Sequence, residues 1–309
     1  MNNIKHNTRP RRLGFATYLV CILQITLCAT AQAAPVHSST PHSVVDDAGS
    51  RIALAGPAQR IISLAPHTTE LLFAAGAGEQ VVGVVSYSNY PEQAQTIQNV
   101  GSYHQFDFEQ IALLKPDLIV GWASGNPKPL LEKLRAMGFT LFLSEPKELD
   151  DIANNIIKLG QLAGTQANAE KAAASYRQQL ADIAQQNKNK KNVTVFYEIW
   201  HSPLMTLGGD HLFNKVLALC SASNAFADLD SLAPQIGVEN VLQRNPDMIL
   251  ASGMDTSRPD WLDKWLDWPQ LSAVKNNHLY FIPPDYLQRH SPRLAIGASQ
   301  LCDHVNKVR

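Results

Sequence analysis

Two segments of the chain repeat one pattern at a fixed distance, and this repeat constrains the fold more than any other feature. The segments "EQIALLKPDLIV" (109–120) and "ENVLQRNPDMIL" (239–250) match at the glutamate, at the Pro-Asp pair and at several apolar positions, with an offset of 130 residues. Each predicts a short helix that stops before the proline, followed by a buried strand of continuous apolar residues. A duplicated helix–strand unit predicts two similar α/β lobes.

Other segments fit this division. Strands are predicted at 60–66, 81–86, 117–122 and 140–145 in the first lobe, and a strand at 193–200 opens the second. Helices are predicted at 147–163 and 166–186. The second is long and mostly polar, as suits a rigid connector that permits little hinge motion. We therefore expect a lobe at 34–164, a connecting helix at 165–188 and a second lobe at 189–309.

The first 33 residues have the pattern of a secretory signal peptide. Basic residues at positions 5, 9, 11 and 12 precede a mostly apolar run at 13–29, and Ala31-Gln32-Ala33 supplies a small-x-small cleavage pattern. A lipidated Cys28 is the alternative. Export to the periplasm is the expectation.

Removal of this segment changes the charge and the cysteine content. Four basic residues and no acidic one are lost, so the net charge moves from −1 to −5, which argues against nucleic-acid binding. Cys220 and Cys302 remain and predict one disulfide in an oxidising compartment, with two buried free thiols as the alternative.

Several motifs carry a resemblance to a known family. The segments at 44–94, 100–122 ("VGSYHQFDFEQIALLKPDLIVGW"), 268–283 ("WPQLSAVKNNHLYFIP") and 291–302 ("SPRLAIGASQLC") resemble the periplasmic substrate-binding proteins of cobalamin and iron-siderophore ABC importers. The motifs "VVSYSNYPEQAQ", "GWASGN" and "DYLQRHSPR", with the two cysteines, are most similar to its cobalamin-binding branch. The resemblance implies two Rossmann-like lobes joined by one helix, with the ligand between them.

Cobalamin is a broad amphipathic disc, so its site should offer aromatic surface and a few polar donors. Aromatic residues follow predicted strands, where ligands bind in open α/β sheets, although core packing is the alternative for any one of them. The resemblance implies that Tyr87 is the pocket tyrosine, that Trp122 lies in the facing loop, and that residues 285–289 touch the polar arms of the ligand, with Arg289 as the best donor. The expected ligand-binding residues are Tyr87, Tyr103, Trp122, Trp200, Asp285, Tyr286, Leu287, Gln288 and Arg289.

The two repeated glutamates are candidate contacts for a partner protein. Glu109 and Glu239 occupy equivalent places in the two lobes, and the resemblance implies that both face the membrane permease of an ABC importer and its ATPase. Charge pairs at the edge of a protein–protein interface set the orientation and the association rate of the two proteins more than their affinity. Two ordinary solvated helix carboxylates are the alternative.

Three residues depart from the family pattern. Tyr103 stands where tryptophan is expected, Ala233 stands where another aromatic residue often sits, and His290 is unusual before Ser-Pro-Arg. Coordination of cobalt by His290, in corrinoids that lack an axial group, is a hypothesis.

Enzyme motifs are not found: the chain has no GxSxG elbow, HExxH pair, Walker loop or CxxC spacing. No cofactor and no protein metal site are expected, and four loop histidines are interpreted as polar rim residues rather than ligands: His67, His104, His201 and His290. We expect a monomeric, non-catalytic carrier of cobalamin. Alternatives are a heme carrier with Tyr103 or Tyr87 as the iron ligand, a ferric-siderophore carrier, and a periplasmic enzyme on the same scaffold.

Overall fold

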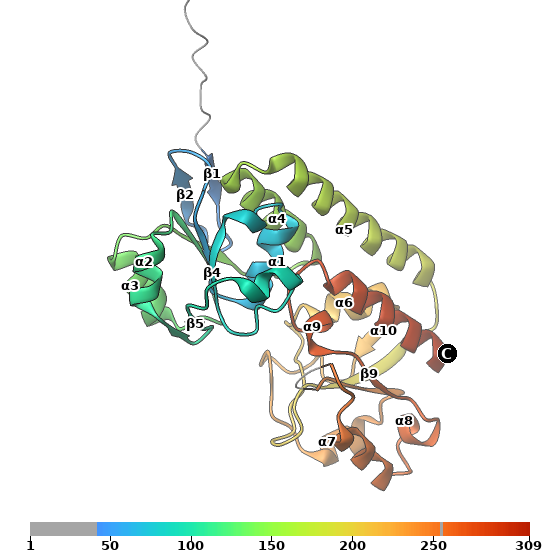
Figure 1. Cartoon of the computed structure of the whole chain (residues 1–309). Helices are drawn as coiled ribbons and strands as arrows, with labels where there is room; N and C mark the ends of the chain where they lie inside the picture. Colours follow the sequence, from blue (N-terminus) through green and yellow to red (C-terminus); the bar gives the residue numbers. More distant parts are fainter. Residues whose placement is uncertain (1–41, 254–255) are drawn as a thin grey trace, which may run out of the picture. The chain divides into compact units, whose positions relative to one another are not determined.

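Two parallel four-stranded sheets provide the framework of the protein (Figure 1). The computed structural model describes residues 42–253 and 256–309, so the expected signal peptide and Cys28 lie outside the described residues. The first sheet has the order β4 (Val81–Val84), β3 (Ile61–Ser63), β7 (Leu118–Trp122), β8 (Leu141–Ser144). The second has the order β10 (Ala222–Asn224), β9 (Val193–Glu198), β11 (Met248–Ala251), β12 (Leu279–Phe281). The α/β fold class expected from the sequence is confirmed.

Smaller elements complete the first half of the described chain. Two antiparallel hairpins are formed by β1 (His42–Val45) with β2 (Arg51–Leu54) and by β5 (Gly101–Ser102) with β6 (Gln105–Phe106). The helices are α1 (Pro66–Ala74), α2 (Phe108–Leu114), α3 (Lys128–Ala136) and α4 (Leu149–Ala163), with single 3-10 turns η1 (Gly78–Gln80) and η2 (Glu92–Thr96). Helix α4 ends at Gly164, whose φ of +73° lies in the left-handed region that glycine adopts without strain.

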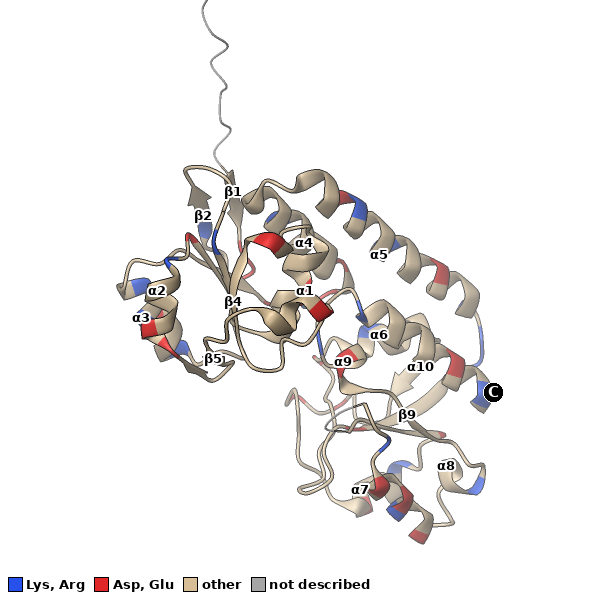
Figure 2. Ribbon diagram, viewed as in Figure 1, with Lys and Arg blue, Asp and Glu red and all other residues tan. Residues whose placement is uncertain are grey.

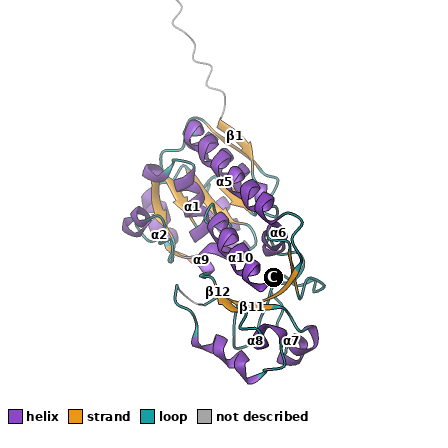
Figure 3. Ribbon diagram, turned by 90° about the vertical axis from the view of Figure 1, so that its right-hand side faces the viewer, coloured by secondary structure: helices purple, strands orange, loops and turns teal. Residues whose placement is uncertain are grey.

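Helices cover both faces of the second sheet. These are α6 (Phe213–Leu219), α7 (Val238–Arg244), α8 (Ser272–Lys275), α9 (Pro284–Leu287) and α10 (Leu294–Val308), with the 3-10 segment η3 (Asp260–Asp267). Alternate residues of β9 face opposite layers: Val195 and Tyr197 join the core cluster that includes α10, whereas Phe196 joins the cluster that includes α7 and η3. Figure 3 shows the sheet between these layers. Burial on both faces explains the continuous apolar sequence of its strands.

The repeat encodes the same local structure twice. Helices α2 and α7 end at Lys115 and Asn245, which both have left-handed backbone, and the Pro-Asp pair follows. Asp117 then accepts hydrogen bonds from the backbone N–H groups of Gln59 and Arg60 at 2.7 and 3.1 Å, next to β3. Asp247 accepts one from Thr194 of β9 at 2.8 Å. In each half, the aspartate therefore ties the start of one strand to its neighbour.

Helix α5 (Gln166–Asn187) connects the two sheets and packs beside α4 at one end and α6 and α10 at the other (Figure 1). Its buried residues follow one another at alternating steps of three and four, so they form one stripe along the helix: Ala169, Ala173, Tyr176, Leu180, Ile183 and Asn187. Gly160 of α4 permits close approach, because a Cβ there would lie 2.2 Å from the Cβ of Ala169. The expected boundaries of the lobes around this helix stay a prediction.

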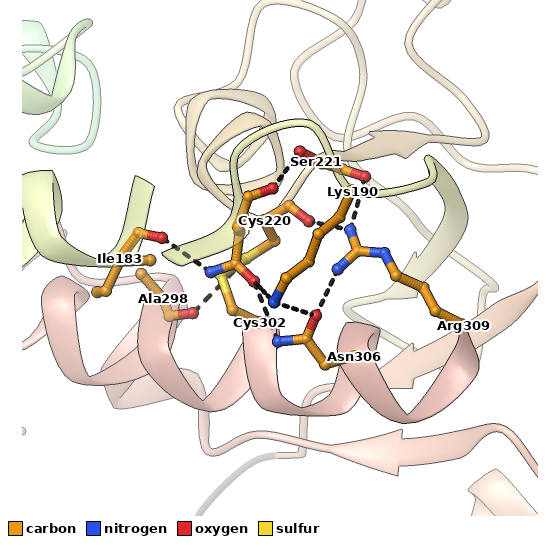
Figure 4. The surroundings of a disulfide bond; sticks show 9 residues. Ile183, Lys190, Cys220, Ser221, Ala298, Cys302, Asn306 and Arg309 are labelled. Carbon is orange, nitrogen blue, oxygen red and sulfur yellow. Dashed lines mark hydrogen bonds between the residues drawn. A yellow bond between two sulfur atoms is a disulfide. The ribbon is translucent and has the colours of Figure 1, made fainter. Parts of the chain in front are cut away.

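The end of α5 is fixed beside a disulfide. Cys220 and Cys302 are bonded across a separation of 82 residues and attach α10 to the end of α6 (Figure 4). The buried Asn187 accepts hydrogen bonds through Oδ1 from Lys190 Nζ and Asn306 Nδ2, both at 3.0 Å. A disulfide that closes a loop of about 80 residues contributes about 4–5 kcal/mol to stability in the chain-entropy model.

Charged residues of both signs are interspersed over the described helices (Figure 2). In residues 42–253 and 256–309, no helix combines the length and the apolar character needed to cross a membrane.

Candidate functional site

Aromatic side chains expected to bind ligand lie at the carboxyl ends of the strands. Tyr87 follows β4 and is 75% exposed, and Trp200 follows β9 and is 43% exposed. Tyr103 follows β5 in a small hairpin, not a strand of the main sheet, and is 40% exposed. Isolated exposed aromatic residues are common on protein surfaces, so a ligand-binding role for these three stays a prediction.

Trp122, at the end of β7, is held inside its own loop. The indole ring lies against Gly125, where a Cβ would come within 1.9 Å of the ring, and it contacts the His67 imidazole edge-on with 5.3 Å between ring centroids. The indole Nε1 is buried and has no hydrogen-bond partner among the described residues. The ring is therefore partly buried rather than presented like Tyr87.

Asn126 is a residue of this region that the sequence interpretation missed. It is 3% exposed, accepts a hydrogen bond from the backbone N–H of Trp122 at 2.7 Å, and donates to the backbone oxygens of Leu64 and Tyr103 at 3.0 and 2.6 Å. It thus fixes the hairpin that carries Tyr103 to the ends of β3 and β7. Its place in "GWASGN", four residues after the tryptophan, is the only signal in the sequence.

Residues 285–289 divide into different environments. Leu287 is 1% exposed and packs against Gly297 of α10, so its side chain offers no surface to a ligand, contrary to expectation. Tyr286 is partly buried on the same core. Gln288 is exposed and donates to Ser252 Oγ at 3.0 Å, next to the end of β11.

A buried carboxylate organises the polar end of this segment. Glu70, in α1, has a side chain only 2% exposed. It accepts hydrogen bonds from Arg289 Nη1 at 3.0 Å, from Ser291 Oγ at 2.5 Å, and from Arg293 through Nε at 2.9 Å and Nη2 at 2.5 Å. Burial lowers the pKa of the Arg293 guanidinium, but its bonds to Glu70 and the nearby carboxylates outweigh this and raise that pKa above its usual value. The cluster of Glu70, Asp285, Arg289, Ser291 and Arg293 is here called the carboxylate clamp.

Arg289 has other partners besides Glu70. Its Nη1 donates to Asn89 Oδ1 at 2.7 Å, and its Nη2 lies 2.8 Å from Asp285 Oδ1. The guanidinium of Arg293 stacks over Tyr90 at 4.2 Å. The "SYSNYP" and "DYLQRHSPR" motifs therefore meet at the carboxylate clamp. The expected best donor to the ligand is instead used mainly within the protein.

Three histidines cluster beside the carboxylate clamp. The ring centroid of His290 lies 6.4 Å from that of His67 and 5.7 Å from that of His211. Burial lowers the pKa of His67 to about 3, with the charges of His290 and Arg289 adding to the effect, and lowers the pKa values of His211 and His290 to about 4. All three imidazoles are neutral near pH 7.

His290 is not placed as the cobalt hypothesis requires. Its Nε2 is buried and has no hydrogen-bond partner among the described residues, and the same holds for His67. A ligand could reach this nitrogen only after rearrangement of the loop. Within the described residues, no group of three or more His, Cys, Asp or Glu side chains has the arrangement of a metal site.

The other two departures from the family pattern lie at the surface. Tyr103 and Ala233 are both exposed, and Leu232, beside Ala233, is 51% exposed. An alanine here leaves a smaller apolar contact area than an aromatic side chain would.

A cavity of about 810 Å³ opens beside Glu70 and Arg293 but contains none of the nine expected ligand residues in its walls. It is bordered by Val81, the first residue of β4, and by the 3-10 turn that precedes it. This is the amino end of the strand, whereas ligands of open α/β sheets bind beyond the carboxyl ends. The expected ligand residues therefore lie outside this cavity, and a ligand site at the carboxyl edge of the sheets stays a prediction.

Comparison with known proteins identifies the family. The model of a family described as periplasmic binding protein matches residues 61–286. The chain belongs to the periplasmic binding protein family. It is 38% identical to the vitamin B12-binding protein of Vibrio cholerae over 250 residues, which cover 81% of this chain and 90% of that protein.

Solved structures agree with this assignment. The crystal structure of the periplasmic vitamin B12-binding protein BtuF of Vibrio cholerae matches with a TM-score of 0.76 and 38% identity, covering 82% of this chain and 98% of that one. The periplasmic heme-binding protein RhuT of Roseiflexus matches with a TM-score of 0.71 and 25% identity, covering 81% and 98%. These relatives are binding proteins by name, as expected for a non-catalytic chain.

Substitution of Glu70 tests the carboxylate clamp. The Glu70→Gln variant removes the charge that Arg289 and Arg293 share, and we expect the free energy of unfolding to fall by about 3–5 kcal/mol, because a buried ionic cluster that loses one sign of charge is left uncompensated. Urea unfolding followed by circular dichroism measures this. The exposed Glu79 gives a matched control, and Glu79→Gln should change stability by less than about 0.5 kcal/mol. Equal stability of both variants would contradict the assignment.

The histidine cluster predicts a pH dependence of stability. Because the folded pKa values of about 3 and 4 lie below the ordinary histidine pKa of about 6.5, the unfolded chain takes up protons first as pH falls. The stability that comes from keeping these histidines neutral is fully present above about pH 6.5. It is lost progressively towards pH 4, by an amount on the order of a few kcal/mol for each histidine. The His290→Ala variant should show a smaller slope of unfolding free energy against pH in this window. The variant of exposed His104, His104→Ala, should keep the wild-type slope.

Proposed function

We propose that this chain is the periplasmic substrate-binding subunit of an ABC importer, which binds cobalamin and delivers it to an inner-membrane permease. The observation that carries the proposal is the 38% identity to a vitamin B12-binding protein over 90% of that protein's length. Exposed Tyr87 and Trp200 at the carboxyl edges of the sheets, and exposed Tyr103 in the hairpin that Asn126 holds beside them, support it, since they suit the broad apolar faces of a corrin ring.

The mechanism is reversible binding without chemistry. The ligand is held between the two halves by aromatic contacts, with Gln288 and Asp285 as polar contacts at its edge. Helix α5 and the carboxylate clamp join the halves at separate places, so closure around the ligand is small. Tyr286 and Trp122 support the site from partly buried positions, and Leu287 anchors its segment in the core.

Docking to the permease uses the repeated glutamates. Glu109 and Glu239 both lie in the first turn of their helices, α2 and α7, and both are exposed. Exposed carboxylates in equivalent places suit pairing with cationic side chains of a partner that must bind and then release. The carrier acts as a monomer, and residues 1–33 direct it to the periplasm, where its named relatives reside.

A heme carrier is the second candidate. The relative from Roseiflexus is a heme-binding protein, and the exposed phenols of Tyr87 and Tyr103 are suitable ligands for ferric iron. Heme and cobalamin differ in their visible spectra, so the two functions are readily separated.

Calorimetric titration tests the ligand. Cyanocobalamin should bind with micromolar or tighter affinity, whereas hemin and a ferric siderophore should bind far more weakly. The Tyr103→Ala variant should bind cyanocobalamin roughly tenfold more weakly, because it loses aromatic contact area. Met137→Ala is a matched control, since that side chain is similarly exposed, at 42% against 40%, but follows α3. Tighter binding of hemin than of cyanocobalamin would contradict the cobalamin proposal and favour a heme carrier.

Double substitution tests docking. The Glu109→Ala/Glu239→Ala variant should bind cyanocobalamin as wild type does, yet support little cobalamin uptake by cells that supply the permease and its ATPase. The control Glu132→Ala removes a carboxylate of similar exposure from α3 and should leave uptake unchanged. Normal uptake with the double variant would exclude these glutamates from docking.

A further inference from the structure

His201, just after β9, is held by a buried carboxylate in a single orientation. Glu198 is the last residue of β9, and its side chain is fully buried. One oxygen, Oε2, accepts a hydrogen bond from Trp265 Nε1 at 2.6 Å, and the other, Oε1, lies 2.8 Å from His201 Nδ1. Burial raises the pKa of Glu198, and the contacts with Trp265 and His201 partly oppose that rise.

The neighbours of His201 also define its tautomer. The Lys264 ammonium can only donate, and its Nζ lies 3.1 Å from His201 Nε2. Nε2 must then be the acceptor, so the proton of the neutral imidazole is on Nδ1 and is donated to Glu198. A carboxylate behind Nδ1 with a lone pair on Nε2 is the arrangement in which protein histidines bind transition metals.

The imidazole is accessible at the expected ligand edge. Its side chain is 28% exposed, and it borders two cavities of about 240 and 280 Å³. The smaller cavity is lined by the exposed Trp200 and by Ser252, which contacts Gln288. Trp261 stacks on one face of the ring, with centroids 5.2 Å apart and planes 10° apart. Nε2 is covered by the exposed, flexible side chain of Lys264 rather than by packed core.

The other rim histidines lack this combination. His67 and His290 have buried Nε2 atoms, as described above. His104 is exposed and contacts Tyr103 edge-on at 4.9 Å between centroids, but no carboxylate is among its described hydrogen-bond partners. Of the four histidines expected to be polar rim residues, His201 is the one prepared to act as a metal ligand.

We propose that His201 Nε2 is an axial ligand to the cobalt of corrinoids whose axial position is exchangeable, and that Glu198 positions it. This inference rests on the proposed function, and it names incomplete corrinoids that lack their own nucleotide base as ligands. In the exchange step, the Nε2 lone pair forms a Co–N bond and the cobalt-bound water leaves as water. The oxidation state of cobalt is unchanged, and Lys264 turns towards solvent.

Visible spectroscopy of the full chain with aquocobinamide tests the proposal. The wild-type complex should show the band shifts that free imidazole produces in aquocobinamide, and His201→Ala should abolish them while excess imidazole restores them. Affinity for aquocobinamide should fall about tenfold or more in His201→Ala, as expected for loss of a metal ligand. Dicyanocobinamide, whose axial positions are occupied, should bind both proteins equally. His278→Ala, at the amino end of β12 and away from the expected ligand edge, is the control and should behave as wild type.

Glu198 needs a second readout because it is buried. Glu198→Gln should retain dicyanocobinamide binding, which reports a folded site, but bind aquocobinamide roughly tenfold more weakly. If dicyanocobinamide binds and the aquocobinamide spectrum of wild type equals that of His201→Ala, the axial-ligand proposal is wrong and the proposed function stands. If neither cyanocobalamin nor either cobinamide binds, the proposed function fails, and this inference fails with it.

Discussion

The burial of one carboxylate, Glu70, governs how the two halves of this protein meet. The Glu70 side chain is only 2% exposed, and removing its charge from water costs free energy. Four hydrogen bonds from Arg289, Ser291 and Arg293 compensate this cost. Such compensation depends on geometry, so α1 and the loop before α10 must keep one relative position. The segment that carries Gln288 and the loop that carries Tyr87 are consequently held on either side of the same charge.

The connection through α5 has a different physical character. The carboxylate clamp is polar and directional, whereas the stripe from Ala169 to Ile183 belongs to a core cluster that runs from β3 through α4 and α5 to β9 and α10. The helix is mostly polar in sequence, but its buried stripe is what joins the halves. Lobe motion in such a molecule requires sliding along that stripe or breaking bonds to Glu70. Both oppose a wide hinge.

Local patterns predicted the fold well and the site only partly. The repeat, the strands and the limits of α5 follow from apolar runs, proline and glycine, whose effects act within a few residues. Arg289 was expected to face the ligand. Its protein partners, Glu70 and Asn89, are about 200 residues away in the sequence, so no local pattern reveals them. The tautomer of His201 likewise depends on contacts with both Glu198 and Lys264, and Lys264 is 63 residues away in the sequence. Long-range polar pairing is what the sequence conceals.

The continuous core has a consequence for folding. Residues from both sheets, such as Ile61 and Val195, belong to one cluster of buried side chains, with Tyr176 of α5 among them. If one half unfolds, the buried side chains of the other half lose the contacts that they make with it in this cluster. The described chain should therefore unfold in one cooperative transition, and damage to either sheet lowers the population of the whole carrier.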